Sequence, residues 1–498
     1  MAFHVYPVTP VREVCTDYRI WINGSEVQTN TARVSRFPYN RRWPGHQRSM
    51  DQSTPAQFLS LEMDSGIEIE ILPPRPFEGV TVRPLSLGIQ PQITGEGRIR
   101  FRLEKPSYLT VEPYGRTDAL HIFADPVRDY GVDPTDPDVI YFGKGEHDVG
   151  KIELKSGQTL YLDAGAVVYA NVYAFEADDI RILGRGILDN SRNREEILFE
   201  ANEVENYAAV QNARRIHTIQ LDFCHRIEVD GITIRDSLVY AMRPVECRDL
   251  RIRNVKVIGS WRYNSDGIDM HNCENVEIDG CFIRTFDDCI CVKGRESFLE
   301  DDGIAQSERR LHSFCGVRVR NCVLWNDWGR ALEIGAETRA EEISDVSFEQ
   351  CCVIHVMHPP LDCQNVDYAD IHHVTWRNIQ VEYDDCIPQG KLQPRDDVTY
   401  EEMELDPAYN PPVICSEVKF HKEYSGGGAR RGINRDLLFE NIDLISNKPP
   451  LFRFRGYDET YTSKDIRICN FRWNGKRITA FAAENLDADA FCKNITIE

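Results

Sequence analysis

The sequence contains no apolar run near the roughly 20 residues that a membrane-spanning helix requires. Basic residues are few relative to acidic ones: 58 lysines and arginines stand against 80 aspartates and glutamates, a net charge of −22. A chain with this excess of negative charge repels polyphosphate. We therefore expect neither a nucleic-acid partner nor a membrane partner.

A secretory leader is also missing from the start of the sequence, where residues 1–15 show no basic segment followed by an apolar one. This pattern predicts a cytoplasmic protein, or a secreted one if a leader has been removed. The 16 cysteines make up about 3% of the chain, which is too few for a disulfide scaffold. They form no CxxC pair and no zinc-finger spacing. We expect mostly reduced, buried thiols, and nothing indicates a bound metal or cofactor.

One apolar pattern dominates what is present, with four apolar residues at positions x, x+2, x+5 and x+7. It first reads Ile227, Val229, Ile232 and Ile234. The later units begin at Leu250, Val276, Val317, Val346, Val374, Leu437 and Ile466. Residues two apart on a strand share a face, and the three-residue step between the pairs, often holding Gly or Asn, predicts a bend. Repeated strand pairs of this kind predict an all-β fold, a right-handed parallel β-helix, rather than a β-sandwich.

The domain organisation follows from where this pattern starts and stops. Residues 1–125 show short alternating strands among Pro and Gly, which predicts an N-terminal β-sandwich domain. Residues 126–137, bounded by Asp-Pro pairs, are predicted to be a linker. Residues 138–498 form the predicted β-helix domain, and we expect the acidic, Pro- and Gly-containing insertion 382–432 to be a long loop along one wall of a cleft.

Three apolar blocks, at residues 268–270, 290–292 and 332–334, share one alternation and are expected to stack on successive coils. The residues two positions before these blocks are Asp266, Asp288 and Arg330. Adjacent coils lie about 4.8 Å apart, so Asp266 is predicted to lie over Asp288, with Asp287 beside them if the chain bends there.

Carboxylates this close repel one another, and burial adds to the effect, so at least one pKa is expected to rise. One protonated and one ionised carboxyl group suit acid–base chemistry. Each aspartate taken singly also fits an ordinary turn cap, and a bound Ca²⁺ is another way to satisfy such a cluster.

These residues resemble the polygalacturonase family, glycoside hydrolase family 28. The N-T-D and D-D-C-I blocks of that family are matched by N-S-D at 264–266 and D-D-C-I at 287–290, and the resemblance covers roughly residues 138–380. The preceding sandwich and the Y-F-G-K-G-E-H-D-V stretch are also similar to the dextranase and isopullulanase family, family 49. Both resemblances imply an inverting glycoside hydrolase on a right-handed β-helix. They further imply that Asp287 is the general acid and that Asp266 and Asp288 activate the water.

The departures from the polygalacturonase pattern concern the substrate. The sequence has Trp328-Gly329-Arg330 where that family has G-H-G, and no convincing R-I-K block follows. Glu333 and Glu337 near Arg330 disfavour a strongly anionic substrate. A neutral, α-glucan-like poly- or oligosaccharide is favoured, with exo action because the insertion can close one end of the cleft.

Three alternatives stay open. The first is a polygalacturonase acting on pectic galacturonides. The second is a Ca²⁺-dependent polysaccharide lyase with Arg330 as base, and the third is a non-catalytic glycan-binding β-helix. The oligomeric state is not fixed by the sequence.

Nine further residues are candidates for contacts with the carbohydrate, by ring stacking or by hydrogen bonds to hydroxyl groups, although a packing role is equally open for each. They are Trp261, Tyr263, Asn264, Asp269, Lys293, Arg295, Trp328, Arg330 and Glu333. His355 and His358 are expected to be core or loop histidines rather than catalytic residues.

Overall fold

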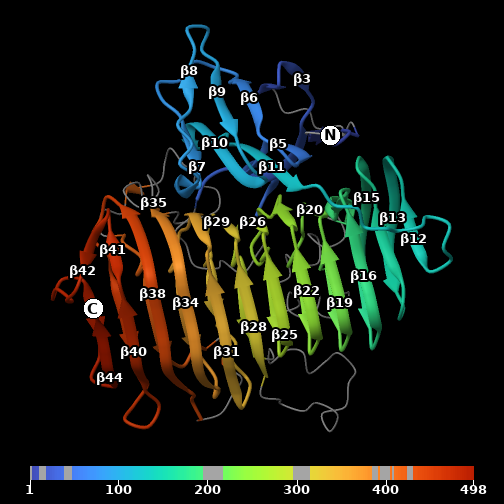
Figure 1. Ribbon diagram of the computed structural model, residues 1–498. Coiled ribbons are helices and arrows are strands. Elements are labelled where there is room, and N and C mark those ends of the chain that lie inside the picture. The colour runs from blue at the N-terminus through green and yellow to red at the C-terminus, as the bar shows by residue number, and fades with distance from the viewer. Residues whose placement is uncertain are drawn as a thin grey trace.

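The computed structural model describes residues 3–9, 18–38, 48–193, 217–294, 314–383, 391–392, 404–405, 409–422, 425 and 430–498. The protein is all-β: a long parallel β-helix carries two smaller N-terminal sheets on one side (Figure 1). This confirms the predicted fold class. The described helices are short 3-10 turns, namely η1 (Met50–Gln52), η2 (Leu85–Leu87) and η3 (Ser191–Asn193). Within the described ranges, none has the length and hydropathy needed to cross a membrane.

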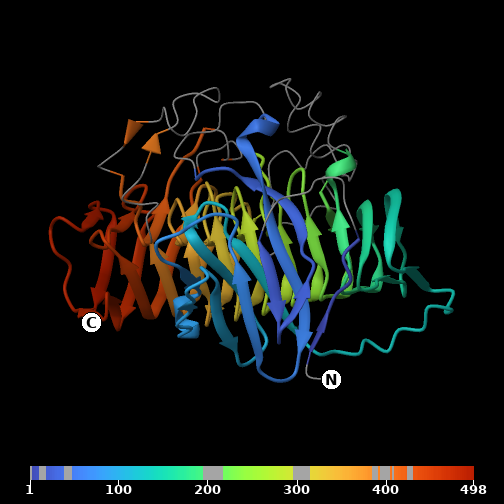
Figure 2. The same cartoon turned by 90° about the horizontal axis from the view of Figure 1, so that it is seen from above.

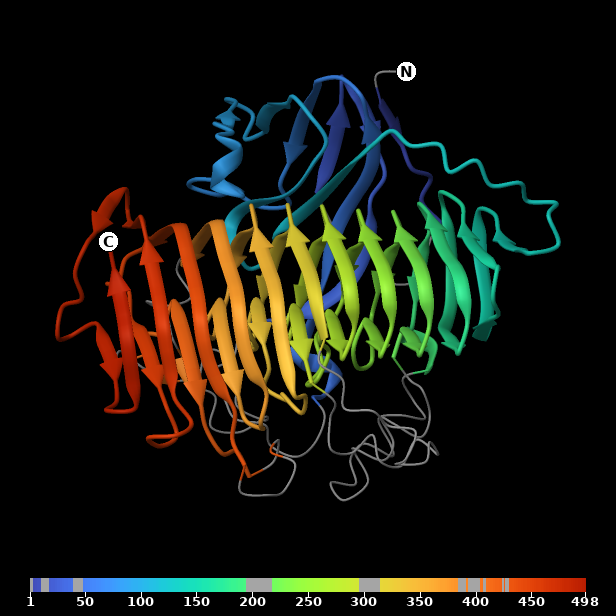
Figure 3. The same ribbon diagram turned by 60° about the horizontal axis from the view of Figure 1, so that its bottom comes forward.

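The β-helix is built from three parallel sheets, whose strands run side by side along its length (Figure 3). The first sheet contains β12 (Val139–Phe142), β14 (Thr159–Leu162), β16 (Asp178–Gly184), β19 (His225–Asp230), β22 (Arg248–Arg253), β25 (Glu274–Asp279), β28 (Phe314–Arg320), β31 (Glu342–Glu349), β34 (Asp370–Tyr383), β38 (Ile433–Ser446), β40 (Ser463–Cys469) and β44 (Cys492–Ile497).

The second sheet contains β13 (Gly145–Leu154), β15 (Ala166–Phe175), β17 (Ile187–Asp189), β20 (Thr233–Arg235), β23 (Lys256–Ile258), β26 (Phe282–Thr285), β29 (Val323–Asn326), β32 (Cys352–His355) and β41 (Phe471–Trp473). The third contains β18 (Ile219–Asp222), β21 (Met242–Val245), β24 (Ile268–His271), β27 (Ile290–Lys293), β30 (Leu332–Ile334), β33 (Leu361–Asn365), β37 (Ile414–Val418), β39 (Phe452–Arg455) and β43 (Leu486–Ala488). Outside these ladders lie β35 (Lys391–Leu392), β36 (Glu404–Leu405) and β42 (Lys476–Ile478).

The bend between the first and second sheets recurs at the Gly and Asn positions that the sequence pattern marks. Gly231, Asn254, Gly280 and Asn321 all have positive φ angles there. Glycine adopts this conformation without a steric penalty, and asparagine tolerates it better than other residues with a side chain. The sharp step between the two apolar pairs of each coil is therefore encoded locally.

The apolar residues of the repeat fill the inside of the coils. The first unit, from Ile227 to Ile234, and its successors belong to one continuous buried core. Phe348, Trp376 and Phe439 stack in it on successive coils, with ring centroids 5.5 and 4.5 Å apart. The cysteines of the described residues are free and mostly buried, so the expected burial of most thiols is confirmed.

The N-terminal strands form two sheets packed face to face over a separate core. One sheet contains β1 (Phe3–Val5), β4 (Asn30–Ser35), β5 (Ser53–Met63), β7 (Thr81–Arg83), β10 (Ser107–Arg116) and β11 (Leu120–Pro126). The other contains β2 (Arg19–Ile22), β3 (Ser25–Val27), β6 (Ile67–Leu72), β8 (Gln92–Ile93) and β9 (Ile99–Leu103). Seen from above, this pair of sheets, the N-terminal sandwich, lies over the middle coils (Figure 2).

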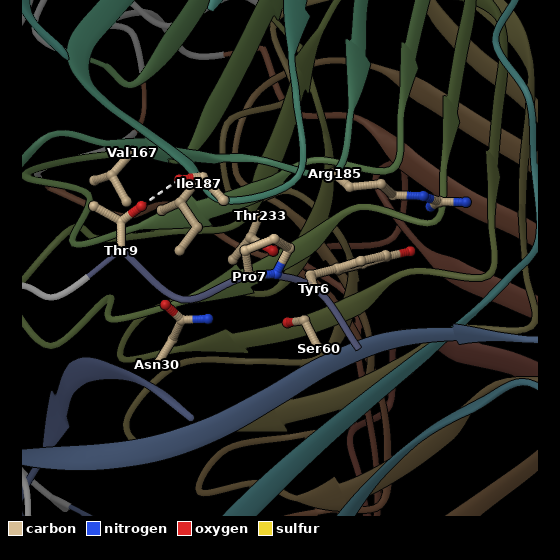
Figure 4. A pocket seen from close by; sticks show the side chains of 10 residues that line it. Tyr6, Pro7, Thr9, Asn30, Ser60, Val167, Arg185, Ile187 and Thr233 are labelled. Atoms are coloured by element: carbon tan, nitrogen blue, oxygen red, sulfur yellow. Dashed lines mark hydrogen bonds between the residues drawn. The ribbon is translucent and has the colours of Figure 1, made fainter. Parts of the chain in front are cut away.

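The contact between the N-terminal sandwich and the β-helix is extensive and buried. Phe58 and Phe123 pack with Phe282 and Trp325 of the second sheet in one cluster. Lys256 of β23 lies 3.0 Å from both carboxylate oxygens of Asp125. A residual cavity of about 10 Å³ remains near β5 (Figure 4), lined by Tyr6, Ser60, Arg185 and others, which is close to the least volume that holds a water.

The predicted insertion 382–432 lies mostly outside the described residues, so its predicted role as a cleft wall is not described. Its described part contains β37, which pairs with β33 as the next strand of the third sheet. The solenoid is therefore resumed within this range rather than interrupted throughout it.

Candidate active site

The three aspartates lie in turns between the second and third sheets. Asp266 precedes β24, and Asp287 and Asp288 lie between β26 and β27. In the ladder of the third sheet, Ile268 pairs with Ile290, which pairs with Leu332. This confirms the predicted register and brings the three carboxyl groups to one place.

One carboxylate oxygen from each of Asp266, Asp287 and Asp288 lies within 4.8 Å of the others. The chain bends at 286–287, so two consecutive aspartates face the same site, as predicted. Asp287 Oδ2 accepts a hydrogen bond from the Asn264 backbone N–H at 3.2 Å. Asp288 Oδ1 accepts one from the Arg330 N–H at 2.7 Å.

The segment 326–330 packs directly against the two aspartates. The side-chain amide of Asn326 donates to the Asp287 carbonyl, as does the Thr285 hydroxyl at 2.5 Å. Gly329 lies so close that a Cβ placed on it would be 2.5 Å from the Asp288 backbone N and from Asp288 Oδ1. A residue without a side chain is thus required beside the acid pair.

Burial is the largest cause that raises the pKa of both Asp266 and Asp287 well above the ordinary aspartate value. For Asp266 the charge of Asp269 adds most to this, and for Asp287 that of Asp288. Asp287 is partly exposed, whereas Asp266 and Asp288 are buried. The expectation that at least one carboxyl group of the cluster has a raised pKa is confirmed.

Lys293 on β27 partly balances this negative charge. Its Nζ lies 2.7 Å from Asp269 Oδ2, 3.6 Å from Asp266 Oδ2 and 3.5 Å from Glu337 Oε2. Its positive charge lowers the pKa of Asp266 and of Asp287, against the effect of burial. Lys293 and Asp269, both predicted to bind sugar, are therefore bound chiefly to each other under the acid cluster.

Arg330 occupies the other side of the acid cluster. Its Nε lies 2.7 Å from Asp362 Oδ2 and 3.6 Å from Glu333 Oε1, and its Nη1 lies 3.8 Å from Asp288 Oδ1. Burial raises the pKa of Glu333 well above its ordinary value, and the charge of Asp288 adds to this. The buried Glu333 also accepts a hydrogen bond from Gln364 at 2.9 Å.

Asp362 and Gln364 were not among the predicted site residues. Asp362 pairs with Glu333 in the third sheet, and its neighbours Leu361 and Cys363 repeat the alternation of residues 332–334. Extending the register by one coil would have identified Asp362.

The predicted stacking of Trp261 and Tyr263 on a sugar is wrong for these two rings, since both are fully buried. Trp261 donates to Asp236 at 3.3 Å, and Tyr263 packs edge-on against Trp328, with ring centroids 4.9 Å apart. Trp328 is partly exposed and stacks on Phe286 at 5.3 Å. Trp328, Asn264 and Arg330 are the predicted contact residues beside the cluster that are partly exposed.

The remaining predicted residues are Arg295, His355 and His358. Arg295 lies outside the described residues. His355 is buried against the N-terminal sandwich, with its Nε2 2.9 Å from Glu112 Oε1. Burial, together with the charge of Arg330, lowers the pKa of His358 to about 3, so this histidine is neutral.

Two groups in the described part of the chain could bring three ligand atoms to one cation. They are Asp266, Asp287 and Asp288, and Asp288, Cys291 and Glu333. The charged groups of Lys293 and Arg330 already lie 3.6 and 3.8 Å from these carboxylates. The cluster therefore has cationic partners of its own.

Residues 176–380 match the model of glycosyl hydrolases family 28, so the chain carries a polygalacturonase-like domain. It is 23% identical over 277 residues to a polygalacturonase of Gossypium barbadense, covering 50% of this chain and 66% of the relative. It is 22% identical over 237 residues to an exopolygalacturonase of Zea mays, covering 47% of this chain and 48% of the relative. The chain thus spans half to two thirds of these relatives.

Among solved structures, Dex49A from Penicillium minioluteum has a similar fold. The TM-score is 0.59 at 15% identity, covering 98% of this chain and 96% of that one. This similarity extends over the N-terminal sheets as well as the β-helix. The resemblances to the polygalacturonase and dextranase families are therefore confirmed at the level of domain and fold.

Proposed function

Starting from a family 28 domain whose three aspartates converge, we propose that this chain is an inverting glycoside hydrolase acting on a poly- or oligosaccharide. The observation that carries the proposal is the cluster of Asp266, Asp287 and Asp288, with oxygens within 4.8 Å of one another. The raised pKa of Asp287 keeps its carboxyl group protonated to higher pH than an ordinary aspartate, which suits a proton donor.

In the proposed reaction, Asp287 is the protonated general acid, and it is the most exposed of the three. Water attacks the anomeric carbon, the bond from that carbon to the glycosidic oxygen breaks, and the Asp287 proton passes to the leaving oxygen. The proton lost by the water passes to Asp266 or Asp288. The anomeric configuration is inverted because the water attacks from the face opposite the leaving group.

The spacing of the cluster bears on where the water sits. Acid and base carboxyl groups of inverting enzymes are usually about 6.5–9.5 Å apart, whereas the nearest oxygens here lie within 4.8 Å. Two O–H···O hydrogen bonds of about 2.7 Å each can bridge such a gap. A water held by Asp266 and Asp288 together therefore fits.

The charges beside the cluster favour a neutral, α-glucan-like sugar. Lys293 is already surrounded by Asp269, Asp266 and Glu337. Arg330 is surrounded likewise by three carboxylates, those of Asp362, Glu333 and Asp288. A uronate brought to either cation would have to compete with these carboxylates.

A polygalacturonase is the second candidate, and the names of the curated relatives favour it. The two are separated by a panel of α-linked neutral oligosaccharides and oligogalacturonides, scored for reducing-end release. We expect release from neutral members, and proton NMR should show the inverted anomer first. Release only from galacturonides would support the second candidate.

The same panel tests the other reaction classes. A Ca²⁺-dependent lyase would give an ultraviolet-absorbing unsaturated product and lose activity with a chelator. A non-catalytic glycan-binding helix would bind sugar and release nothing. We expect chelator-insensitive hydrolysis without the chromophore, and either other result would overturn the proposal. Exo action remains a prediction, tested by whether products are released only from chain ends.

A further inference from the structure

The N-terminal sandwich touches both turns that carry the three aspartates. It lies over the middle coils of the second sheet, where β26 and β29 end (Figure 1). Its apolar residues pack with Phe282 of β26 and Trp325 of β29. Two of its arginines extend beyond this apolar contact: Arg48 contacts these turns directly, and Arg116 contacts the segment 326–330 that packs on Asp287 and Asp288.

Arg116, the last residue of β10, binds the segment that packs on the acid pair. Its guanidinium donates to the carboxylate of Asp327, and it also donates to the Asn326 carbonyl at 3.3 Å. Asp327 is almost fully buried, and its other partners are the Trp325 indole N–H at 2.9 Å and Arg284 at 3.5 Å. Arg116 therefore fixes the start of segment 326–330 from outside the β-helix.

This segment in turn fixes the two aspartates. Asn326 donates to the Asp287 carbonyl, and the Arg330 N–H donates to Asp288 Oδ1 at 2.7 Å. Gly329 donates to the Phe286 carbonyl at 3.0 Å. A continuous set of hydrogen bonds thus leads from Arg116 to both carboxyl-bearing residues.

Arg48, just before η1, binds the residue that leads into the turn carrying Asp266. The buried guanidinium donates to the Trp261 carbonyl, and it is oriented by Gln52 at 2.9 Å. Its carbon Cζ lies 4.0 Å from the ring centroid of Phe286, the residue before Asp287. Trp261 leads into the tight turn 262–265, where the Ser265 N–H donates to the Arg262 carbonyl at 3.2 Å, and then to Asp266.

We propose that Arg48 and Arg116 are positioning residues, through which the N-terminal sandwich holds the two aspartate-bearing turns in register. The sandwich is then a structural part of the catalytic centre rather than an appended binding module. The catalytic consequence rests on the proposed function, but the positioning itself does not. The guanidinium group suits this task because its donors are fixed in one plane.

The test compares Arg116→Ala and Arg48→Ala with a matched control, Arg128→Ala. Arg128 also joins the region of the sandwich to the β-helix, through Asp230 and through Glu228 at 3.2 Å, but it contacts neither turn. Each full-length variant is measured for kcat, KM and backbone amide exchange. Two further measurements are made in case Arg116→Ala is unstable. The first is the activity of Arg116→Lys, and the second is the activity of Arg116→Ala with added guanidinium.

A displacement of about 1 Å at reacting groups costs on the order of 10²-fold in rate, so we expect kcat to fall by about that factor in Arg116→Ala, with KM little changed. Guanidinium should restore part of the loss, and Arg116→Lys should be intermediate. The Asp327, Gly329 and Arg330 amides should lose protection in Arg116→Ala, and the Ser265 amide in Arg48→Ala.

Equal kcat and equal exchange in Arg116→Ala, Arg48→Ala and Arg128→Ala would overturn the proposal. If the wild-type protein hydrolyses no member of the panel, the proposed function fails. The exchange experiment still decides whether the arginines hold the turns, because it needs no substrate.

Discussion

Replacing Gly329 by alanine tests how closely segment 326–330 must approach the acid pair. The φ angle of Gly329 lies outside the left-handed region, so alanine is allowed by the backbone. The added Cβ would lie 2.5 Å from the backbone carbon of Asp287 and from Asp288 Oδ1, where ordinary contact begins at 3.4 Å. The segment or the aspartates must therefore move by about 0.9 Å.

A shift of this size should lower kcat by on the order of 10²-fold. Overpacking of this kind costs about 1–3 kcal/mol of stability, which thermal unfolding measures independently. Gly79→Ala is the matched control, since nothing lies within 4 Å of a Cβ placed there. If Gly329→Ala has the kcat and Tm of Gly79→Ala, the inferred close approach is wrong.

Two further predictions concern the charge of the cluster. The pH dependence of kcat should be bell-shaped, because Asp266 and Asp287 both have raised pKa values. Catalysis requires Asp287 to be protonated while Asp266 is ionised. At low pH Asp266 is protonated and cannot accept the proton of the water, and at high pH Asp287 is ionised and cannot donate one. A flat profile from pH 4 to 8, about the range where such groups titrate, would refute this. Lys293→Met should move both limbs to higher pH by about one unit or more, since the lost cation lies 3.6 Å from Asp266. Unmoved limbs would show that Lys293 does not govern the titration of the pair.

Much of the fold could be predicted because its determinants are local and repeated. The quartet from Ile227 to Ile234 specifies which side chains face the core. Glycine or asparagine at the step specifies the bend, as at Asn254 and Gly280. The register that brings Asp266 to Asp288 follows from the same alternation.

The parts that could not be predicted depend on contacts between distant segments. Trp261 looks like a sugar-stacking residue in the sequence, but it is fully buried and hydrogen-bonded to Asp236 and Arg48. The bond between Arg116 and Asp327 joins residues 211 positions apart, and no periodicity links them. Such pairs arise from how the N-terminal sandwich docks on the coils, and a single sequence carries no local pattern for that docking.

The most direct test of the central claim is the turnover of Asp287→Asn on whichever oligosaccharide the wild-type protein cleaves. General acid catalysis contributes about 10²–10⁴-fold, so we predict a kcat lower by that factor with an unchanged Tm. Asp345→Asn, an exposed surface aspartate paired with Arg318, should keep wild-type turnover. Turnover in Asp287→Asn equal to that of Asp345→Asn would contradict the assignment of the three aspartates as the hydrolytic centre.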